Sequence, residues 1–215
     1  TVVTGNPIRR VILDTTRKTG IKNLGLNPTK KTLLVFGGSQ GAASINQAMK
    51  KLYNKFVNMD DIQLIHITGK KNYDKLIKDL RTHNGIDIKR IDHIKIIPYL
   101  NNIEWAYAAA DLIVYRAGAT GLAEIAAKGV PSILIPYPHA AGNHQLYNAR
   151  TMQKHGAAEI IRENNLTSKN LINKIINLIN DEQQLNKMAE NSKKLGQPDA
   201  RSIIIDEINN LINYK

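Results

Sequence analysis

Small and polar residues are concentrated in two stretches of the chain, residues 116–124 (RAGATGLAE) and residues 136–145 (PYPHAAGNHQ). Small residues allow backbone N–H groups to approach an anion closely, and the N-terminus of a helix favours negative charge. The carboxylate of Glu124 can accept hydrogen bonds from both hydroxyls of a ribose, because it has two acceptor oxygens. The amide of Gln145 can donate to one sugar hydroxyl and accept from another. These residue types suit a ligand that carries a diphosphate and sugar hydroxyls.

A third stretch rich in glycine, residues 37–42 (GGSQGA), follows the apolar run 32–36 and precedes a predicted helix. A strand, a glycine loop and a helix in this order can bind phosphate or sugar at the helix N-terminus. The stretch is not G-x-G-x-x-G, and no Gly-Lys-Ser/Thr follows it, so NAD and ATP are poorly supported as ligands. Ser39 is a candidate ligand contact or the N-cap of the following helix, and the two roles are compatible.

Six short apolar runs alternate with segments of helical periodicity, and this alternation positions the three stretches. The predicted strands are residues 32–36, 63–68, 94–97, 112–115, 132–135 and 158–161. The predicted helices are residues 42–57, 72–80, 103–110, 122–128, 143–154, 168–180, one capped by Asp181, and 203–212. The pattern predicts an α/β fold with a doubly wound, parallel, six-stranded sheet. Loops at the carboxyl ends of such strands form the ligand crevice.

Composition limits the classes of protein to which the chain can belong. It has 215 residues and no cysteine, which excludes disulfides and agrees with a reducing cytoplasm. No apolar run approaches the roughly 20 residues of a membrane span, and no signal peptide is recognisable. The net charge of +12 is compatible with a solvated basic surface, or with attraction to anionic lipid or to a nucleotide diphosphate. The basic residues are dispersed, so nucleic-acid binding is not supported.

The ordered motifs resemble the MurG family of bacterial glycosyltransferases. The matching segments are TGNPIR at 4–9, FGGSQGA at 36–42, RAGAT at 116–120, AE at 123–124, PYPH at 136–139, HQ at 144–145, NA at 148–149, GAA at 156–158 and DA at 199–200. The resemblance spans essentially the whole chain but only the family's C-terminal, donor-binding half. It implies a Rossmann-like C-terminal domain of a GT-B glycosyltransferase. We expect residues 1–215 to form this domain, with 1–31 as the interdomain linker segment and entry region, and an N-terminal acceptor domain outside this sequence.

The resemblance also implies roles for individual residues. Arg9 would reach the donor phosphates, and the backbone at Leu100 would contact the uracil. Glu124 would hold the ribose hydroxyls, and Gln145 would hold the hydroxyls of N-acetylglucosamine. The implied donor-binding residues are Arg9, Ser39, Leu100, Ala119, Thr120, Gly121, Leu122, Ala123, Glu124 and Gln145. By residue type alone, Arg9 is equally a surface cation, Leu100 a packing residue and Glu124 a partner of the helix dipole.

One position departs from the family pattern, and the catalytic group is unassigned. The family more often has a hydroxyl or a β-branched residue where this chain has Gly121, and we therefore expect weaker binding of the phosphate. His139 is a candidate general base by type, although a single loop histidine is more often structural. No D-x-D pair and no His/Asp cluster has the spacing of metal ligands, so neither a metal nor a cofactor is predicted.

The resemblance implies transfer of N-acetylglucosamine from UDP-GlcNAc to a lipid-linked muramyl-pentapeptide, in peptidoglycan synthesis. The enzyme would lie on the cytoplasmic face of the membrane and contact anionic lipid, and its general base would belong to the missing half. Two alternatives stay open. The chain is a fragment or a natural UDP-sugar-binding subunit of a bipartite transferase, or it is an enzyme similar to UDP-GlcNAc 2-epimerase.

Overall fold

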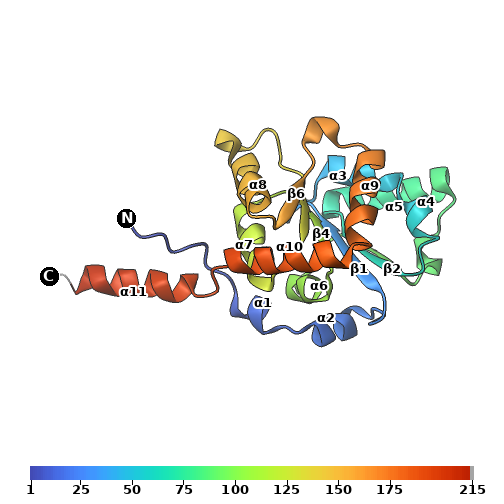
Figure 1. Ribbon diagram of the computed structural model, residues 1–215. Coiled ribbons are helices and arrows are strands. Elements are labelled where there is room, and N and C mark those ends of the chain that lie inside the picture. The colour runs from blue at the N-terminus through green and yellow to red at the C-terminus, as the bar shows by residue number, and fades with distance from the viewer. Residues whose placement is uncertain (214–215) are drawn as a thin grey trace.

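The computed structural model describes residues 1–213 and contains one parallel sheet of six strands with helices on both faces (Figure 1). The strands are β1 (Lys31–Phe36), β2 (Ile62–Ile67), β3 (Ile94–Ile97), β4 (Leu112–Tyr115), β5 (Ser132–Leu134) and β6 (Ala158–Ile160). Their order is β3-β2-β1-β4-β5-β6, and every pair is parallel. The predicted doubly wound α/β fold is confirmed. The order reverses between β1 and β4, where such sheets bind ligands.

Eleven α-helices connect and flank the strands within the described residues. They are α1 (Arg10–Asp14), α2 (Arg17–Leu24), α3 (Ala43–Lys50), α4 (Tyr53–Phe56), α5 (Lys70–Asn84), α6 (Ile103–Ala109), α7 (Ala119–Lys128), α8 (His144–Lys154), α9 (Ser168–Ile179), α10 (Glu182–Leu195) and α11 (Ala200–Ile212). Short 3₁₀ turns lie at Ile88–Arg90, Ala141–Asn143 and Glu163–Asn165. Side chains cap two predicted helices as expected, since Thr167 accepts from the Asn170 amide and Asp181 from the Gln184 amide.

The entry region contains two helices, α1 and α2, where the sequence pattern predicted none. Thr16 begins α2 by accepting a hydrogen bond from the Thr19 amide, and Gly25 ends it in the left-handed conformation. Gly20 packs directly on α6, where an added Cβ would lie 2.4 Å from the carbonyl oxygen of Trp105. The polar composition of this segment gave no indication of α2, because the helix packs on α6 through Gly20 and not through an apolar side chain.

Other boundaries moved for similarly local reasons. The predicted helix 42–57 is divided into α3 and α4, and the helix predicted at 72–80 extends over 70–84. The last helix begins at Ala200 instead of residue 203. The helix predicted at 122–128 begins three residues earlier, at Ala119, because Gly118 serves as its N-cap. This last shift changes the position of the candidate ligand residues within the helix.

The hydrophobic core lies on both faces of the sheet because successive side chains of a strand point to opposite faces. In β1, Leu33 and Val35 belong to one cluster, with residues of α3, α4, α5, α9 and α10. Leu34 and Phe36 belong to the other cluster, with residues of α1, α6, α7 and α8. All the β1 residues from Thr32 to Phe36 are buried, as expected for a central parallel strand.

The glycine loop after β1 is held against the loop after β2 by a close crossing of their backbones. A Cβ on Gly41 would lie 2.0 Å from the carbonyl oxygen of Thr68, and a Cβ on Gly69 would lie 2.3 Å from that of Gln40. Both glycines have positive φ, 74° and 82°. Glycine is therefore required at both positions by space and by conformation.

A buried chain of hydrogen bonds leads from α4 to the Thr68 carbonyl at this crossing. The hydroxyl of Tyr53 lies 2.5 Å from His66 Nδ1, and His66 Nε2 lies 2.9 Å from Asn46 Oδ1. The side-chain nitrogen of Asn46 then donates to the Thr68 carbonyl at 2.9 Å. Burial lowers the pKa of His66 from 6.5 to about 3, so the ring is neutral. This network requires Nε2 to carry the proton.

The neutral state of His66 predicts a specific pH dependence of stability. Below its ordinary pKa, the unfolded chain binds a proton at residue 66 and the folded chain does not. The free energy of unfolding should therefore fall by about 1.4 kcal/mol for each unit by which the pH is lowered, from about pH 6 to about pH 4. The variant His66→Gln should lack this component, as measured by urea unfolding across the pH range. Identical pH slopes for the two proteins would show that His66 is protonated in the folded state.

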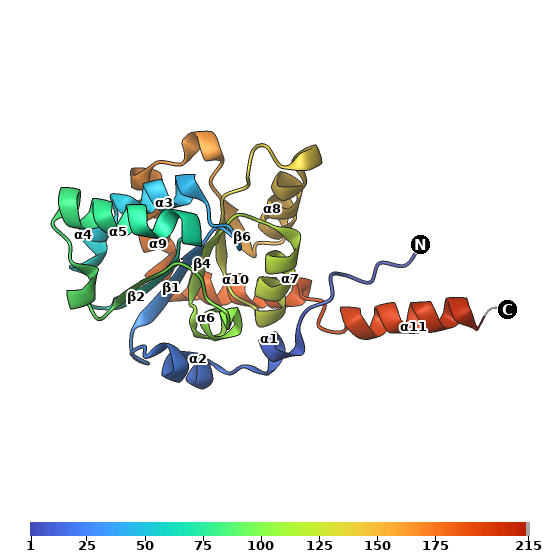
Figure 2. The same cartoon turned by 180° about the vertical axis from the view of Figure 1, so that it is seen from behind.

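Helix α11 and the N-terminal segment extend away from the body at the same end of the molecule (Figures 1 and 2). Ala200 is the one buried residue among the helix's described positions. Apolar side chains are exposed along α11, at Ile205, Ile208, Leu211 and Ile212, and in the N-terminal segment, at Val2 and Val3. No helix within residues 1–213 is long and apolar enough to cross a membrane. This end of the molecule therefore presents an uncovered apolar surface.

Candidate functional site

A cavity of about 450 Å³ opens at the carboxyl ends of the strands, where the strand order reverses between β1 and β4. Its walls come from the loop after β1, the start of α6 and the first turns of α7. It is lined by Arg9, Phe36, Gly38, Ser39, Ile67, Tyr99, Leu100, Asn101, Ile103, Tyr107, Tyr115, Thr120, Gly121 and Glu124. The structure thus brings together these predicted residues: Arg9, Ser39, Leu100, Thr120, Gly121 and Glu124.

Arg9, the predicted contact of the donor phosphates, and Glu124, the predicted contact of the ribose, are hydrogen-bonded to each other in this cavity. Arg9 donates to Oε1 of Glu124 from Nε at 3.4 Å and from Nη2 at 3.3 Å. Glu124 is buried, whereas the Arg9 side chain is 52% exposed and can leave the pair. Glu124 lies in the second turn of α7 and not the first, because α7 begins at Ala119. The helix-dipole interpretation of Glu124 is correspondingly weakened, since the dipole acts mainly within the first turn.

Three aromatic side chains that sequence reasoning did not select form the floor beneath Glu124. Phe36 stacks on Tyr115 with ring centroids 4.4 Å apart and lies 5.8 Å from the ring of Tyr107. Burial, and then the charge of Glu124, raise the pKa of Tyr115 to about 12 and that of Tyr107 well above its usual range. Both phenols are therefore neutral donors. Phe36 and Tyr115 end β1 and β4 before the glycine loops, but a strand-end aromatic residue is not by itself distinguishable from a core residue.

Helical geometry divides the predicted residues of α7 between two cavities. Thr120 and Gly121 face the same space as Glu124. Ala119, Leu122 and Ala123 line a separate cavity of about 240 Å³, together with Asn6 and Gln197. The amide of Leu122 already donates to the carbonyl of Gly118 at 3.0 Å, so Leu122 cannot present this group to a ligand.

The residues Ser39 and Gln145 also have surroundings that differ from expectation. Ser39 is not an N-cap, because α3 begins at Ala43 after Ala42 and no side chain caps it. Ser39 instead is exposed at the cavity wall. Gln145 is absent from the lining of this cavity, and its Oε1 accepts a hydrogen bond from the Tyr137 amide at 3.0 Å. Its amide nitrogen is the part that can contact a ligand.

His139 is placed in the exposed loop after β5, outside the cavity at the strand ends. Its ring packs edge-on against Tyr137, with centroids 5.5 Å apart. It is not among the residues that line the main cavity. The geometry does not support His139 as a catalytic base, although it leaves the catalytic residue unassigned. Within residues 1–213 no group of three or more His, Asp or Glu side chains could hold a metal ion.

A buried cation, Arg116, joins the loops around the cavity. It is 7% exposed and donates to Ser44 Oγ at 2.6 Å and to the Ile135 carbonyl at 3.2 Å. It also forms a two-pronged ion pair with Glu163, and its guanidinium lies 5.4 Å from the ring centroid of Tyr137. Burial acts to raise the pKa of Glu163, but hydrogen bonds from Arg116 and Ser44 outweigh it and lower the pKa. The sequence motif contained Arg116 without indicating this role.

Comparison with known proteins shows the family of the chain. Residues 32–204 match the family model described as the glycosyltransferase family 28 C-terminal domain. The chain belongs to glycosyltransferase family 28. The resemblance to the C-terminal half of MurG proteins is thereby confirmed.

Relatives of this family 28 domain are longer than the chain itself. A protein of Halothermothrix orenii is 54% identical over 206 residues, which are 96% of this chain and 55% of the relative. Its name is UDP-N-acetylglucosamine–N-acetylmuramyl-(pentapeptide) pyrophosphoryl-undecaprenol N-acetylglucosamine transferase. The chain therefore spans about half the length of the curated relatives it matches.

Solved structures show the same arrangement. The crystal structure of Acinetobacter baumannii MurG is 26% identical, with a TM-score of 0.73 over 93% of this chain and 55% of that one. The S. aureus MnaA structure with UDP, at 17% identity, has a TM-score of 0.71 over 100% of this chain and 55% of that one. This second likeness shows the fold alone.

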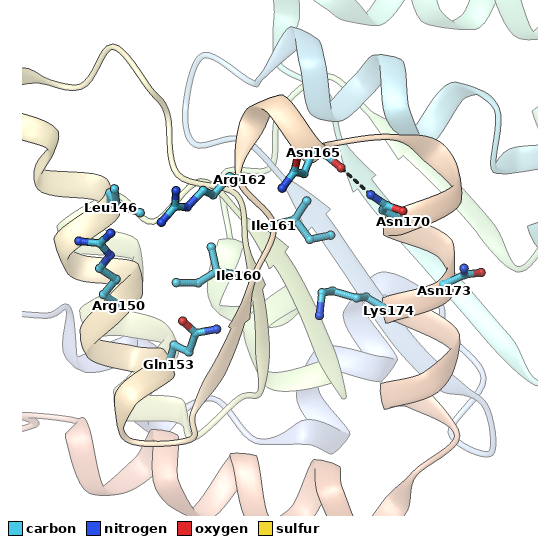
Figure 3. A pocket seen from close by; sticks show the side chains of 10 residues that line it. All are labelled: Leu146, Arg150, Gln153, Ile160, Ile161, Arg162, Asn165, Asn170, Asn173 and Lys174. Atoms are coloured by element: carbon cyan, nitrogen blue, oxygen red, sulfur yellow. Dashed lines mark hydrogen bonds between the residues drawn. The ribbon is translucent and has the colours of Figure 1, made fainter.

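The family 28 domain has another cavity, of about 490 Å³, between α8, β6 and α9 (Figure 3). Arg162 points toward α8, and Asn170 donates to the carbonyl of Asn165 at 2.9 Å. Lys174 is paired with Glu159. None of the predicted donor-binding residues is among those that line it. The strand-end cavity is therefore the candidate site of this family 28 domain.

We expect Arg116 and Glu163 to contribute to the free energy of unfolding as a coupled pair. Arg116→Met should lower the free energy of unfolding by about 1–3 kcal/mol, because it leaves the partly buried carboxylate of Glu163 without its cation. The double variant Arg116→Met/Glu163→Gln should be less destabilised than the sum of the two single variants. Urea unfolding of all four proteins measures the coupling. As a matched control, Arg10→Met removes a cation from an exposed pair and should change little. Additive effects at positions 116 and 163 would contradict the coupling.

Proposed function

We propose that this chain is the donor-binding half of an N-acetylglucosaminyltransferase. The whole enzyme would transfer N-acetylglucosamine from UDP-GlcNAc to undecaprenyl-pyrophosphoryl-MurNAc-pentapeptide, in peptidoglycan synthesis. The observation that carries the proposal is the position of Arg9 and Glu124, which pair at a cavity between β1 and β4. The 54% identity to a transferase of this name supports the choice of substrate.

The cavity offers a group of suitable chemistry for each part of a uridine diphosphate. Glu124 would accept hydrogen bonds from the ribose once Arg9 turns toward the phosphates, which a half-exposed side chain can do. The amides of Ala119, Thr120 and Gly121 are the first donors of α7, where the helix dipole favours an anion. Leu100 and its neighbours would enclose the base. Gln145 would reach the sugar from the rim.

The chemical contribution of this half would be to hold the leaving group. In the proposed transfer, an acceptor hydroxyl attacks the anomeric carbon, the bond from that carbon to the phosphate oxygen breaks, and UDP leaves. Negative charge develops on the departing diphosphate, so Arg9 and the α7 amides would stabilise it most as the bond breaks. The general base and the acceptor site would belong to the other half of the enzyme.

Helix α11 and the N-terminal segment support a partner half. They leave the body together and expose apolar side chains such as Val3 and Leu211, which are 86% and 77% exposed. We propose that an N-terminal acceptor domain covers this surface, and that residues 1–31 form the linker and entry region. The proposed enzyme would lie on the cytoplasmic face of the membrane, where a chain of net charge +12 is attracted to anionic lipid.

The direct test is titration of UDP-GlcNAc and UDP by calorimetry, in buffer containing EDTA. Both ligands should bind without a divalent metal. Glu124→Gln should weaken both by about 1–3 kcal/mol, the range for a charged hydrogen-bond partner. Glu159→Gln, which removes a carboxylate at β6 outside the cavity, is the matched control.

A UDP analogue without the 2′ and 3′ hydroxyls separates the ribose role from a structural one. The loss caused by Glu124→Gln should disappear with this analogue. An equal loss with both ligands would mean that Glu124 only supports α7. Absence of UDP-GlcNAc binding by the unaltered chain would refute the proposed function itself.

The chain alone should release no UDP in the presence of a lipid-linked muramyl acceptor. Transfer requires an acceptor oxygen aligned with the anomeric carbon and a base to take its proton. None of the described residues that line the cavity has a clear claim to either task. Adding the N-terminal half of the Halothermothrix orenii relative, fused or in trans, should produce acceptor-dependent UDP release. Turnover by the chain alone would contradict this division of labour.

A further inference from the structure

The phenol of Tyr115 occupies space that two glycines leave open at the start of α7. A Cβ on Gly121 would lie 2.5 Å from the Tyr115 hydroxyl oxygen, and a Cβ on Gly118 would lie 2.7 Å from it. Tyr115 is only 6% exposed, yet it lines the candidate site. Its ring is held by stacking on Phe36, so the hydroxyl has a fixed position. The hydroxyl therefore lies directly beneath the first turn of α7.

The Tyr115 hydroxyl is in the right state to donate a hydrogen bond. Burial and the charge of Glu124 raise its pKa to about 12, although the nearby backbone of Gly118 acts to lower it. The hydroxyl stays protonated at neutral pH. Tyr115 lines the cavity, so its protonated hydroxyl can donate to an acceptor bound there.

We propose that Tyr115 is a ligand-binding residue whose hydroxyl donates a hydrogen bond to the diphosphate of the bound nucleotide, through the gap at Gly121. This inference rests on the proposed function, because it concerns the same cavity. The α7 amides and the Tyr115 hydroxyl then converge on one anion. In this chain the helix carries no hydroxyl at position 121, and the strand beneath it supplies one.

The proposal explains why Tyr115 and Gly121 occur together. Any side chain at position 121 would collide with the phenol, and its Cβ would also lie 2.6 Å from the adjacent ring carbon Cζ. The ring of Tyr115 belongs to the core, so it cannot move aside without disturbing Phe36. The two positions form a unit, and a substitution at one requires a change at the other.

The test compares ligands with and without phosphate. Tyr115→Phe keeps the stacked ring and removes the hydroxyl. We expect it to bind UDP about tenfold more weakly, as for loss of a hydrogen bond to a charged group, and to bind uridine unchanged. Tyr107→Phe removes the neighbouring buried phenol hydroxyl beside Glu124. This control should affect UDP and uridine alike, because Tyr107 faces the ribose side. Thermal unfolding of each variant checks that it folds.

An exchange of the two side chains provides a second readout. Gly121→Thr alone should weaken UDP binding, because its Cβ meets the phenol. In the double variant Tyr115→Ala/Gly121→Thr, the new threonine on α7 supplies a hydroxyl in place of the phenol. This double variant should therefore bind UDP more tightly than the single variant Tyr115→Ala. Unchanged UDP affinity in Tyr115→Phe, or an equal loss for UDP and uridine, would overturn the role of the hydroxyl while leaving the proposed function intact. Failure of the unaltered chain to bind UDP would overturn both.

Discussion

The guanidinium of Arg116 joins segments that follow four of the six strands. It contacts Ser44 after β1, the carbonyl of Ile135 after β5 and the carboxylate of Glu163 after β6, and it lies itself at the end of β4. A buried cation must have all its hydrogen-bonding positions satisfied, so these segments have little freedom to move independently. The rigid edge that results holds the glycine loop and the first turn of α7 in fixed positions. The geometry of the candidate site therefore depends on a group outside the lining of its cavity.

The fold could be predicted from the sequence to a large extent because its central strands are buried on both faces. Such strands are short continuous apolar runs, and residues 112–115 were delimited correctly by this criterion. The order of strands in the sheet has no such local signal. Helix α2 was missed because its contact with α6 is made by a glycine, which has no apolar side chain to reveal it. Packing between backbones has no counterpart in a hydrophobicity pattern.

The residues that line the cavity could be predicted where a motif follows a strand. They were harder to predict where the start of a helix determines which side chains face the cavity. Thr120 and Glu124 line the strand-end cavity, but Leu122 packs in the core because α7 begins at Ala119. An error of three residues in a helix start changes which side chains face a ligand. Tyr107 and Phe36 were missed because aromatic residues at strand ends and in helices are ordinary core residues. Only their position around Glu124 distinguishes them, and sequence spacing does not supply that position.

The close approach of Gly5 to Gln197 and Ala200 has a consequence for motion in the proposed whole enzyme. A Cβ on Gly5 would lie 2.8 Å from that of Gln197, so the N-terminal segment and the start of α11 leave the body as neighbours. If the partner half binds α11, two segments cross between the halves side by side. A paired connection bends readily about one axis but resists twisting about its length. Closure of the two halves over a substrate would then follow a single hinge direction, so the halves would meet in the same alignment at each turnover.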